Sequence, residues 1–378
     1  MKVLHINCNY TTRGLHQTMM EHLDSYTDNN VFVPTNDIRK TVIVPNDNVL
    51  ISECFNNRDR FFFHRKQKKI IDAIERAYDI QSFDCIHAYT VFTDGNVARY
   101  LSRKYNIPYL VTVRNTDINI FFKYMLHLRN KGIEILKESA GIICLSPSYK
   151  KMLLDKYVSS KSAECIKKKI SIVPNGIDDF WLLNTYKEKP IDLTNSRIAE
   201  KELKTIYVGQ INKNKNLEES VNAIVELKKQ GWSVTFTAIG EVQDEEIFSQ
   251  LNKYDFFNYN NSVPKEELIS FYRSADIFIM PSHTETFGLV YAEAMSQGLP
   301  VIYTRGQGFD GQFKDGEVGY SVDDNNPLEL AEKILMVCNN YQGLSQSCLK
   351  NVSKFNWDIV AREYLNLYHK AEGLSSFR

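Results

Sequence analysis

The chain has 378 residues, with 46 basic and 46 acidic side chains, so its formal net charge is zero. That balance gives no global attraction for nucleic acid, and no run of 18 or more apolar residues is present to span a membrane. The seven cysteines form no CxxC pair and show no metal-ligand spacing, which predicts a reducing, cytoplasmic compartment. The opening MKVLHINCNY predicts a strand rather than a signal peptide, because its apolar part is short and interrupted.

The first half of the sequence alternates short apolar runs with helical patterns, which is typical of a parallel sheet with crossover helices. A helix is predicted to begin near Leu15, after a turn in which Gly14 is the only glycine. A dinucleotide-binding oxidoreductase would need GxGxxG at this turn, so that class is disfavoured. Strands are predicted at residues 3–7, 31–34, 41–45, 85–90, 109–113, 141–146 and 170–174.

The second half repeats the same alternation, so two domains are expected. The polar residues 184–200, which include Pro190, are predicted to be a linker. The final helix, about 357–378, is predicted to complete the first domain, so that the domains comprise residues 1–180 and 181–356. Strands of the second domain are predicted at residues 205–209, 234–240, 277–280 and 301–303.

Residues 276–304 carry the most informative pattern in the chain. A buried strand is followed by a polar loop and by a helix whose first backbone N–H groups belong to Gly288, Leu289 and Val290. Such groups have no intrahelical partner and lie at the positive end of the helix dipole, so they form an anion site. Two acids flank it, Glu285 before the helix and Glu293 within it. Each acid by itself is as readily explained by a solvated surface.

A glutamate, seven residues and a second glutamate across a strand-to-helix turn resemble the signature of the retaining glycosyltransferases of family 4. The resemblance implies the GT-B fold, in which two doubly wound Rossmann-like α/β domains face each other across a cleft. It also implies that Glu285 meets the donor sugar, that the helix start meets the diphosphate, and that Glu293 holds the ribose. A glycosidase is disfavoured, since its paired carboxyls lie about 5–9.5 Å apart and eight helical residues rise about 12 Å.

The same resemblance extends to the loop after residues 205–209, where the family carries an arginine and a lysine that neutralise the diphosphate. Lys215 matches the lysine, but Gln210 stands at the arginine position, for which Lys213 or Arg305 are candidate substitutes. The resemblance implies Glu285 and Lys215 as catalytic residues, a nucleotide sugar as substrate, and neither cofactor nor metal. The implied donor-binding residues are Gly209, Gln210, Lys215, Gly240, Val263, Glu285, Phe287, Gly288, Leu289, Val290 and Glu293.

The first domain is implied to bind the acceptor. Family members commonly carry a histidine after the strand at 109–113, where this chain has Arg114 and Asn115. These two residues either hydrogen-bond sugar or phosphate or only shape the loop. The implied acceptor-side or cleft residues are Arg13, Gly14, His87, Arg114 and Asn115.

Residues 58–69 hold six Lys/Arg and three consecutive phenylalanines, Phe61 to Phe63. The segment is either a solvated helix face over a buried aromatic ridge or a patch for anionic lipid or a phosphate-bearing acceptor. The second alternative predicts an enzyme that is peripheral on the inner membrane face.

The sequence therefore predicts a retaining, metal-independent hexosyltransferase that moves a sugar from a nucleotide-sugar donor to a hydroxyl of a glycan or lipid-linked acceptor. A role in cell-surface polysaccharide or glycolipid synthesis is expected, and nucleic acid is not expected as a partner. The alternatives are a nucleotide-sugar isomerase or phosphorylase with the same architecture, or a non-catalytic protein that binds sugar nucleotides.

Overall fold

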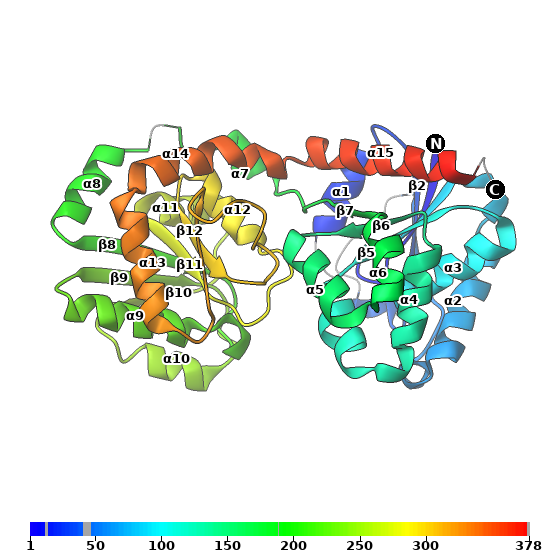
Figure 1. Ribbon diagram of the computed structural model, residues 1–378, viewed down its shortest axis with the longest axis horizontal. Helices are drawn as coiled ribbons and strands as arrows, with labels where there is room; N and C mark the ends of the chain where they lie inside the picture. The colour runs from blue at the N-terminus through cyan, green and yellow to red at the C-terminus, as the bar shows by residue number, and fades with distance from the viewer. Residues whose placement is uncertain (12–13, 41–46, 188, 376–378) are drawn as a thin grey trace. The chain divides into compact units, whose positions relative to one another are not determined.

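The computed structural model describes the whole chain except residues 12–13, 41–46, 188 and 376–378. The chain divides into two compact units, each with its own sheet (Figure 1). Unit 1 comprises Met1–Leu145, Tyr149–Gly176 and Trp357–Arg378, and unit 2 comprises Ser146–Ser148 and Ile177–Asn356. The C-terminal helix α15 (Trp357–Ser375) therefore returns to unit 1 and packs along α1 (Leu15–Leu23).

Unit 1 is built on a seven-stranded parallel sheet of order β3-β2-β1-β4-β5-β6-β7. Both faces of the sheet are covered by helices, so every residue of its inner strands β4, β5 and β6 is buried rather than every second one. The strands are β1 (Lys2–Ile6), β2 (Asp28–Thr35), β3 (Val49–Glu53), β4 (Cys85–Ala88), β5 (Tyr109–Val113), β6 (Gly141–Cys144) and β7 (Ile170–Ile172). The other helices are α2 (Phe63–Ala77), α3 (Asp94–Tyr105), α4 (Arg129–Glu138), α5 (Pro147–Tyr157) and α6 (Ser160–Lys167).

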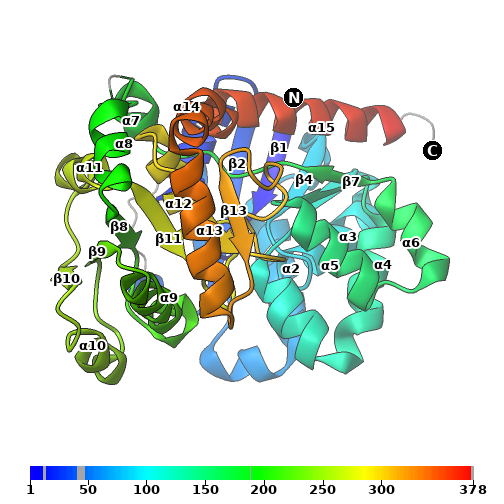
Figure 2. The ribbon, with the colours of Figure 1, turned by 60° about the vertical axis from the view of Figure 1, so that its left-hand side comes forward.

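Unit 2 is built on a six-stranded parallel sheet of order β10-β9-β8-β11-β12-β13. Helices α9 and α13 lie side by side against it (Figure 2). The strands are β8 (Glu202–Val208), β9 (Ser233–Ile239), β10 (Phe257–Asn260), β11 (Ile277–Met280), β12 (Val301–Thr304) and β13 (Gly319–Val322). The helices are α7 (Asp179–Leu183), α8 (Ile191–Ala199), α9 (Leu217–Lys229), α10 (Glu245–Leu251), α11 (Lys265–Ser274), α12 (Leu289–Ser296), α13 (Pro327–Asn339) and α14 (Tyr341–Asn351).

The predicted α/β class and the long apolar strands are confirmed, but three details differ. Residues 184–200 are not simply a linker, because α8 forms there and packs Ile191 and Ile198 against the core of unit 2. Strands β3, β10 and β13 were not predicted, since each contains polar residues or glycine that weaken the strand pattern. The strand predicted at 41–45 lies outside the described residues.

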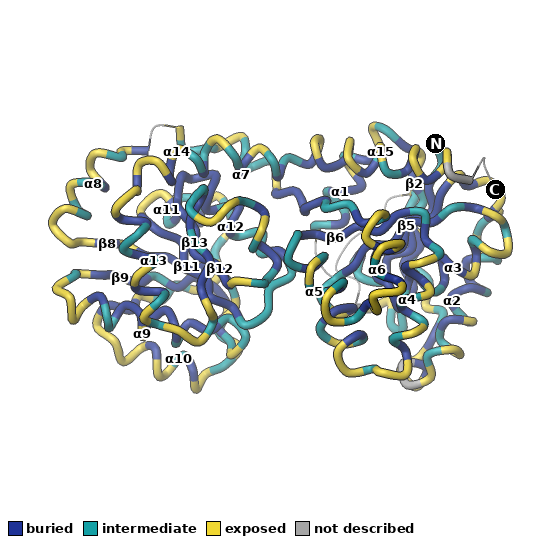
Figure 3. The backbone as a smooth tube through the Cα atoms, in the orientation of Figure 1, coloured by how far each residue is buried: buried dark blue, intermediate teal, exposed yellow. Residues whose placement is uncertain are grey.

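In both units the central strands are the most deeply buried segments (Figure 3). Polar and glycine-containing loops leave their carboxyl ends, which is where open α/β sheets bind ligands. None of the helices in the described part of the chain combines the length and the apolar character needed to cross a bilayer.

Candidate active site

The candidate active site of unit 2 is organised by the turn from β11 into α12. Gly288 adopts φ 74°, and a Cβ atom there would lie 2.5 Å from the ring of Tyr291. The Tyr291 hydroxyl in turn donates a hydrogen bond of 2.6 Å to the carbonyl of Met280, at the end of β11. A glycine is therefore required for both conformation and space, and the buried tyrosine fixes the helix start relative to the strand.

The first turn of α12 remains accessible. Gly288, Leu289 and Val290 are half-buried, and the first N–H groups of the helix have no intrahelical acceptor. Together with the helix dipole they favour an anion at this point. The strand, the turn and the helix start lie where the sequence pattern predicted them.

Lys215 and Glu285 form an ion pair beside this helix start. Their Nζ and Oε2 atoms lie 2.6 Å apart, and their side chains are only 20% and 15% exposed. The other carboxylate oxygen of Glu285 accepts the N–H of Thr286 at 3.0 Å. The N–H of Lys215 is held at 3.2 Å by the side chain of Asn212. Both charged groups are thus positioned by backbone contacts before any ligand is present.

Two asparagines that the sequence analysis missed hold the β8–α9 loop against the loop after β11. Asn214 donates to the carbonyl of Thr284 at 2.9 Å and accepts the Thr284 N–H at 3.1 Å. Asn216, in the left-handed region with φ 57°, donates to the carbonyl of Pro281 at 3.0 Å. The tandem Asn-Lys-Asn-Lys-Asn spacing was the available signal, since alternate asparagines bracket Lys215.

Glu293 lies within α12 and is half-buried. Its carboxylate accepts a hydrogen bond of 3.3 Å from the Tyr272 hydroxyl. Burial, with a smaller contribution from the negative charge of Asp178, raises the pKa of Glu293 to about 7. The pKa of this carboxyl is therefore well above the usual range of a glutamate.

A pocket of about 230 Å³ lies at the carboxyl ends of β8 and β9. A Cβ atom on Gly240 would lie 2.0 Å from the carbonyl oxygen of Gly209, so only a glycine permits this close approach of the two strand ends. Four of the predicted donor-binding residues line the pocket, namely Gly209, Gln210, Gly240 and Val263.

Two predictions about unit 2 need correction. The Phe287 side chain is buried against Phe309 and Phe355, so only its backbone remains available to a ligand. Arg305 does not replace the missing arginine at Gln210, because its guanidinium is paired with Asp323 at 2.6 Å and with Glu329.

The predicted acceptor-side residues of unit 1 differ in how accessible they are to a ligand. Arg114 and Asn115 are half-buried and follow β5 at the carboxyl edge of the sheet, and Gly14 is exposed. Arg13 lies outside the described residues. The assignment of His87 to the cleft is wrong: its ring is fully buried, with nitrogens 2.8 Å from the Tyr368 hydroxyl and 2.9 Å from that of Thr112. The cause is α15, which covers the face of β4 from which His87 projects.

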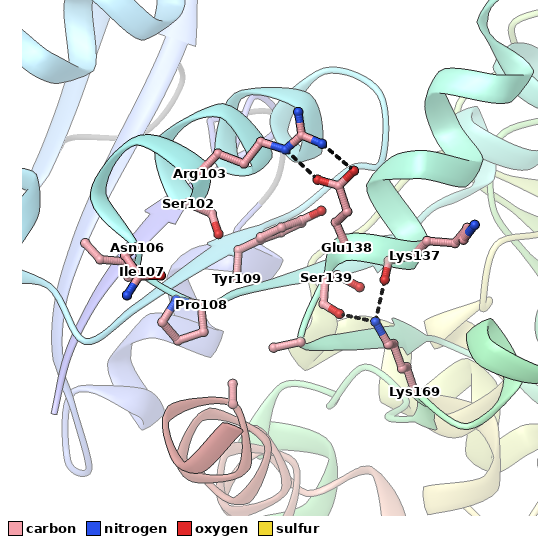
Figure 4. Close-up of a pocket in the computed structure, with 12 residues that line it drawn as sticks. Ser102, Arg103, Asn106, Ile107, Pro108, Tyr109, Lys137, Glu138, Ser139 and Lys169 are labelled. Carbon is pink, nitrogen blue, oxygen red and sulfur yellow. Dashed lines mark hydrogen bonds and ion pairs between the residues drawn. The ribbon is translucent and has the colours of Figure 1, made fainter. Parts of the chain in front are cut away.

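A larger cavity, of about 520 Å³, lies at the opposite, amino edge of the unit 1 sheet (Figure 4). Its polar groups bind one another: Arg103 holds Glu138 through two bonds of 2.7 and 2.8 Å, and Lys169 caps the carbonyl of Ser139 at 2.8 Å. None of the predicted site residues lines it. Within the described ranges, no group of three or more His, Cys, Asp or Glu side chains is arranged to hold a metal ion.

Comparison with known proteins agrees with this geometry. The family model for glycosyl transferases group 1 matches residues 188–355, and the model for glycosyltransferase family 4 matches residues 32–179. The two matches together span most of the chain. The chain belongs to the family 4 glycosyltransferases. Glu285 and Glu293 lie within the group 1 match, and the protein is a glycosyltransferase of the GT-B fold.

Two curated relatives of this glycosyltransferase align over most of its length. The capsular polysaccharide biosynthesis glycosyltransferase CapM of Staphylococcus aureus is 26% identical over 291 residues, 73% of each chain. The alpha-monoglucosyldiacylglycerol synthase of Acholeplasma laidlawii is 26% identical over 306 residues, 75% of each chain. Among solved structures, HepE of Anabaena in complex with UDP matches with a TM-score of 0.71 at 18% identity and covers all of both chains.

Proposed function

We propose that this glycosyltransferase moves a sugar from a nucleotide sugar to an acceptor hydroxyl with retention of anomeric configuration. The observation that carries the proposal is the Lys215–Glu285 pair, 2.6 Å apart beside the accessible start of α12. A cation and a helix start on one side, and a carboxylate next to them, suit a ligand that joins a diphosphate to a sugar.

In the proposed reaction, the bond between the anomeric carbon and the diphosphate oxygen breaks while negative charge grows on the diphosphate. Lys215 and the N–H groups of Leu289 and Val290 would stabilise that charge. The acceptor oxygen forms the new bond on the face that the leaving group vacates, and its proton passes to the departing diphosphate. Glu285 would bind a hydroxyl of the donor sugar, and Glu293 the ribose hydroxyls. The protein then contributes positioning and charge stabilisation.

The support for a nucleotide-sugar donor comes partly from HepE, whose structures hold UDP and UDP-glucose. The pocket bounded by Gly209, Gly240 and Val263 would take the base side of the nucleotide. Because Gln210 is neutral and Arg305 is engaged elsewhere, the exposed Lys213 is the remaining candidate for a second cation near the diphosphate. Unit 1 would bind the acceptor.

The acceptor is proposed to belong to cell-surface polysaccharide or glycolipid synthesis. The relatives are named as a capsular polysaccharide biosynthesis glycosyltransferase and an alpha-monoglucosyldiacylglycerol synthase, which fit these two areas. We further propose that the enzyme works in the cytoplasm and visits the inner membrane face through residues 58–69. This segment spans the turn Asn57–Phe61 and the first half of α2, and Phe62 is 60% exposed.

Internal contacts reduce the number of cations that the segment offers to a membrane. The buried Asp59 pairs with Arg65 at 3.0 Å and with Lys69 at 2.6 Å. Arg58 and Lys68 are exposed. At about 1 kcal/mol for each cation near an anionic surface, attachment should be weak and reversible. Sedimentation with anionic and neutral liposomes, at low and high salt, tests this, and Phe62→Ser should lower binding to the anionic ones.

The transfer reaction is tested by supplying nucleotide sugars with candidate acceptors and assigning the anomeric configuration of the product by NMR. The donor is first identified by thermal shift, because a ligand at a hundred times its Kd stabilises a fold by about 2.7 kcal/mol. Retention predicts the same configuration in donor and product, and inversion would refute the mechanism. Conversion of the donor without an acceptor would instead favour an isomerase or phosphorylase.

A further inference from the structure

Three buried nitrogen atoms at the carboxyl edge of the unit 1 sheet lack hydrogen-bond partners among the described residues. They are Nδ2 of Asn7, Nδ1 of His16 and Nη2 of Arg114. Buried polar groups in folded proteins are nearly always paired with protein or with a ligand or water. Three unpaired groups in one neighbourhood therefore call for a common partner.

The strand register brings these groups together. Asn7, Tyr89 and Arg114 are the first residues beyond β1, β4 and β5, which are neighbours in the sheet. Ile6 pairs with Ala88, and Ala88 with Val111. Since side chains alternate between the faces of a strand, Asn7, Tyr89 and Arg114 project from the same face. That face is the one covered by α1 and α15.

Two of the three groups, His16 and Arg114, lie beside the ring of Tyr89. The His16 ring, from α1, stands edge-on to it with a centroid separation of 5.2 Å. The guanidinium carbon of Arg114 lies 6.0 Å from the same centroid. Asn7 has its carboxamide oxygen engaged by the N–H of Asn9 at 3.0 Å, so its amide group is left as a donor.

The guanidinium of Arg114 forms no ion pair among the described residues, but its charge interacts with that of the buried Asp117 carboxylate. The carboxylate of Asp117 accepts the backbone N–H groups of Arg114 at 2.9 Å and of Val91 at 3.0 Å. Burial and the Arg114 charge hold the pKa of His16 well below its usual range. A neutral ring can donate from Nδ1 in one tautomer.

The large cavity of Figure 4 has the opposite character. Its Arg103 and Lys169 side chains are committed to Glu138 and to backbone carbonyls, and the other lysine that lines it, Lys137, is exposed. The Asn7, His16 and Arg114 group offers an amide, an imidazole and a guanidinium. Arg114 and Asn115 are half-exposed, so a ligand can approach from the edge of the sheet.

We propose that Asn7, His16 and Arg114 form a subsite for a phosphate group. Charge-assisted bonds from a guanidinium to phosphate are among the stronger hydrogen bonds in proteins, and the other two donors would complete the shell. The inference rests on the proposed function in one respect, since the phosphate is assigned to the acceptor. The enzyme would then glycosylate a phosphorylated acceptor, either a soluble phosphate ester or a lipid-linked one.

The test is calorimetric titration of the full-length Lys215→Ala variant with inorganic phosphate. This background removes the Lys215 cation, which would otherwise offer phosphate a second site in unit 2. Adding Arg114→Gln should weaken phosphate binding by about tenfold or more, and His16→Ala should weaken it as well. Lys156→Gln, which removes an exposed cation on α5, is the matched control and should change nothing. Thermal melts check that each variant folds, and His16→Ala replaces Arg114→Gln if the latter does not.

Equal phosphate affinity in Arg114→Gln and the control, or no binding in the Lys215→Ala background, would overturn the proposal. Acetate that competes as well as phosphate would overturn the assignment to phosphate. Glycerol phosphate and vesicles with phosphatidic acid, tested as competitors, separate a soluble acceptor from a lipid-linked one. No step requires turnover, so a failure of the proposed transfer reaction leaves this result interpretable.

Discussion

Glu293 should make donor binding depend on pH. Its pKa is raised to about 7 by burial, whereas ribose hydroxyls can donate hydrogen bonds only to the oxygens that are free of a proton. Donor binding is therefore linked to loss of this proton. Proton linkage gives the direction and magnitude of the pH dependence of donor affinity. For a pKa of about 7, this affinity is nearly maximal at pH 8, about half-maximal at pH 7 and about tenfold weaker at pH 6.

The assay is calorimetric titration of the cognate nucleotide sugar between pH 6 and 8. A nucleotide sugar has no phosphate monoester, so its own charge is constant over this range. At pH 6, titrations in buffers of different ionisation enthalpy should report release of nearly one proton per donor bound. At pH 8, Glu293→Gln should bind about 10- to 150-fold more weakly, the range for a hydrogen bond to a charged group.

The variant should also lose the pH dependence, because glutamine does not titrate. Glu246→Gln, an exposed acid on α10, is the control and should keep the wild-type profile. A wild-type affinity that is flat from pH 6 to 8, or a slope that survives in Glu293→Gln, would refute the assignment of Glu293 to the ribose.

Three further predictions concern the charge, the turn and the core of unit 2. Lys215→Ala should lower kcat by about 10²–10³, the usual cost of one donor to a developing anion, and EDTA should leave wild-type turnover unchanged; loss of activity that magnesium restores would contradict this. Gly288→Ala should destabilise unit 2 by about 1–2 kcal/mol, because alanine is strained at φ 74° and its methyl would meet Tyr291, which thermal melts with and without donor can measure. Asp276→Ala should cost about 3 kcal/mol by urea unfolding, since it leaves Arg197 without its buried partner; a change within about 0.5 kcal/mol, typical of a surface site, would show the pair to be unimportant.

The signature stretch was predictable because its chemistry is local. Glu285, Gly288 and Glu293 follow one another across a single turn, and the glycine, the flanking strand and the helix start are all visible in the order of residues. Strand β5 was predicted to the residue for a similar reason, since a fully buried parallel strand is a mostly apolar run with clear ends.

The predictions that failed depended on segments distant in the chain. His87 looked accessible because it lies near the end of a strand, but α15, some 280 residues later, buries it against Tyr368. Arg305 looked available until Asp323 and Glu329 were brought beside it.

By itself, the sequence determined the α/β class, the GT-B resemblance and the contiguous pattern from Glu285 to Glu293, because local propensity and strand periodicity depend on the order of residues. Only the tertiary structure decided which charged side chains form ion pairs within the protein and which remain available to a ligand. Lys215 meets Glu285 across 70 residues, whereas Asp117 binds the backbone N–H of Arg114 and forms no ion pair with its guanidinium among the described residues. The physical reason is that an ion pair or a hydrogen bond acts over a few ångströms, and only the fold determines which side chains come within that distance.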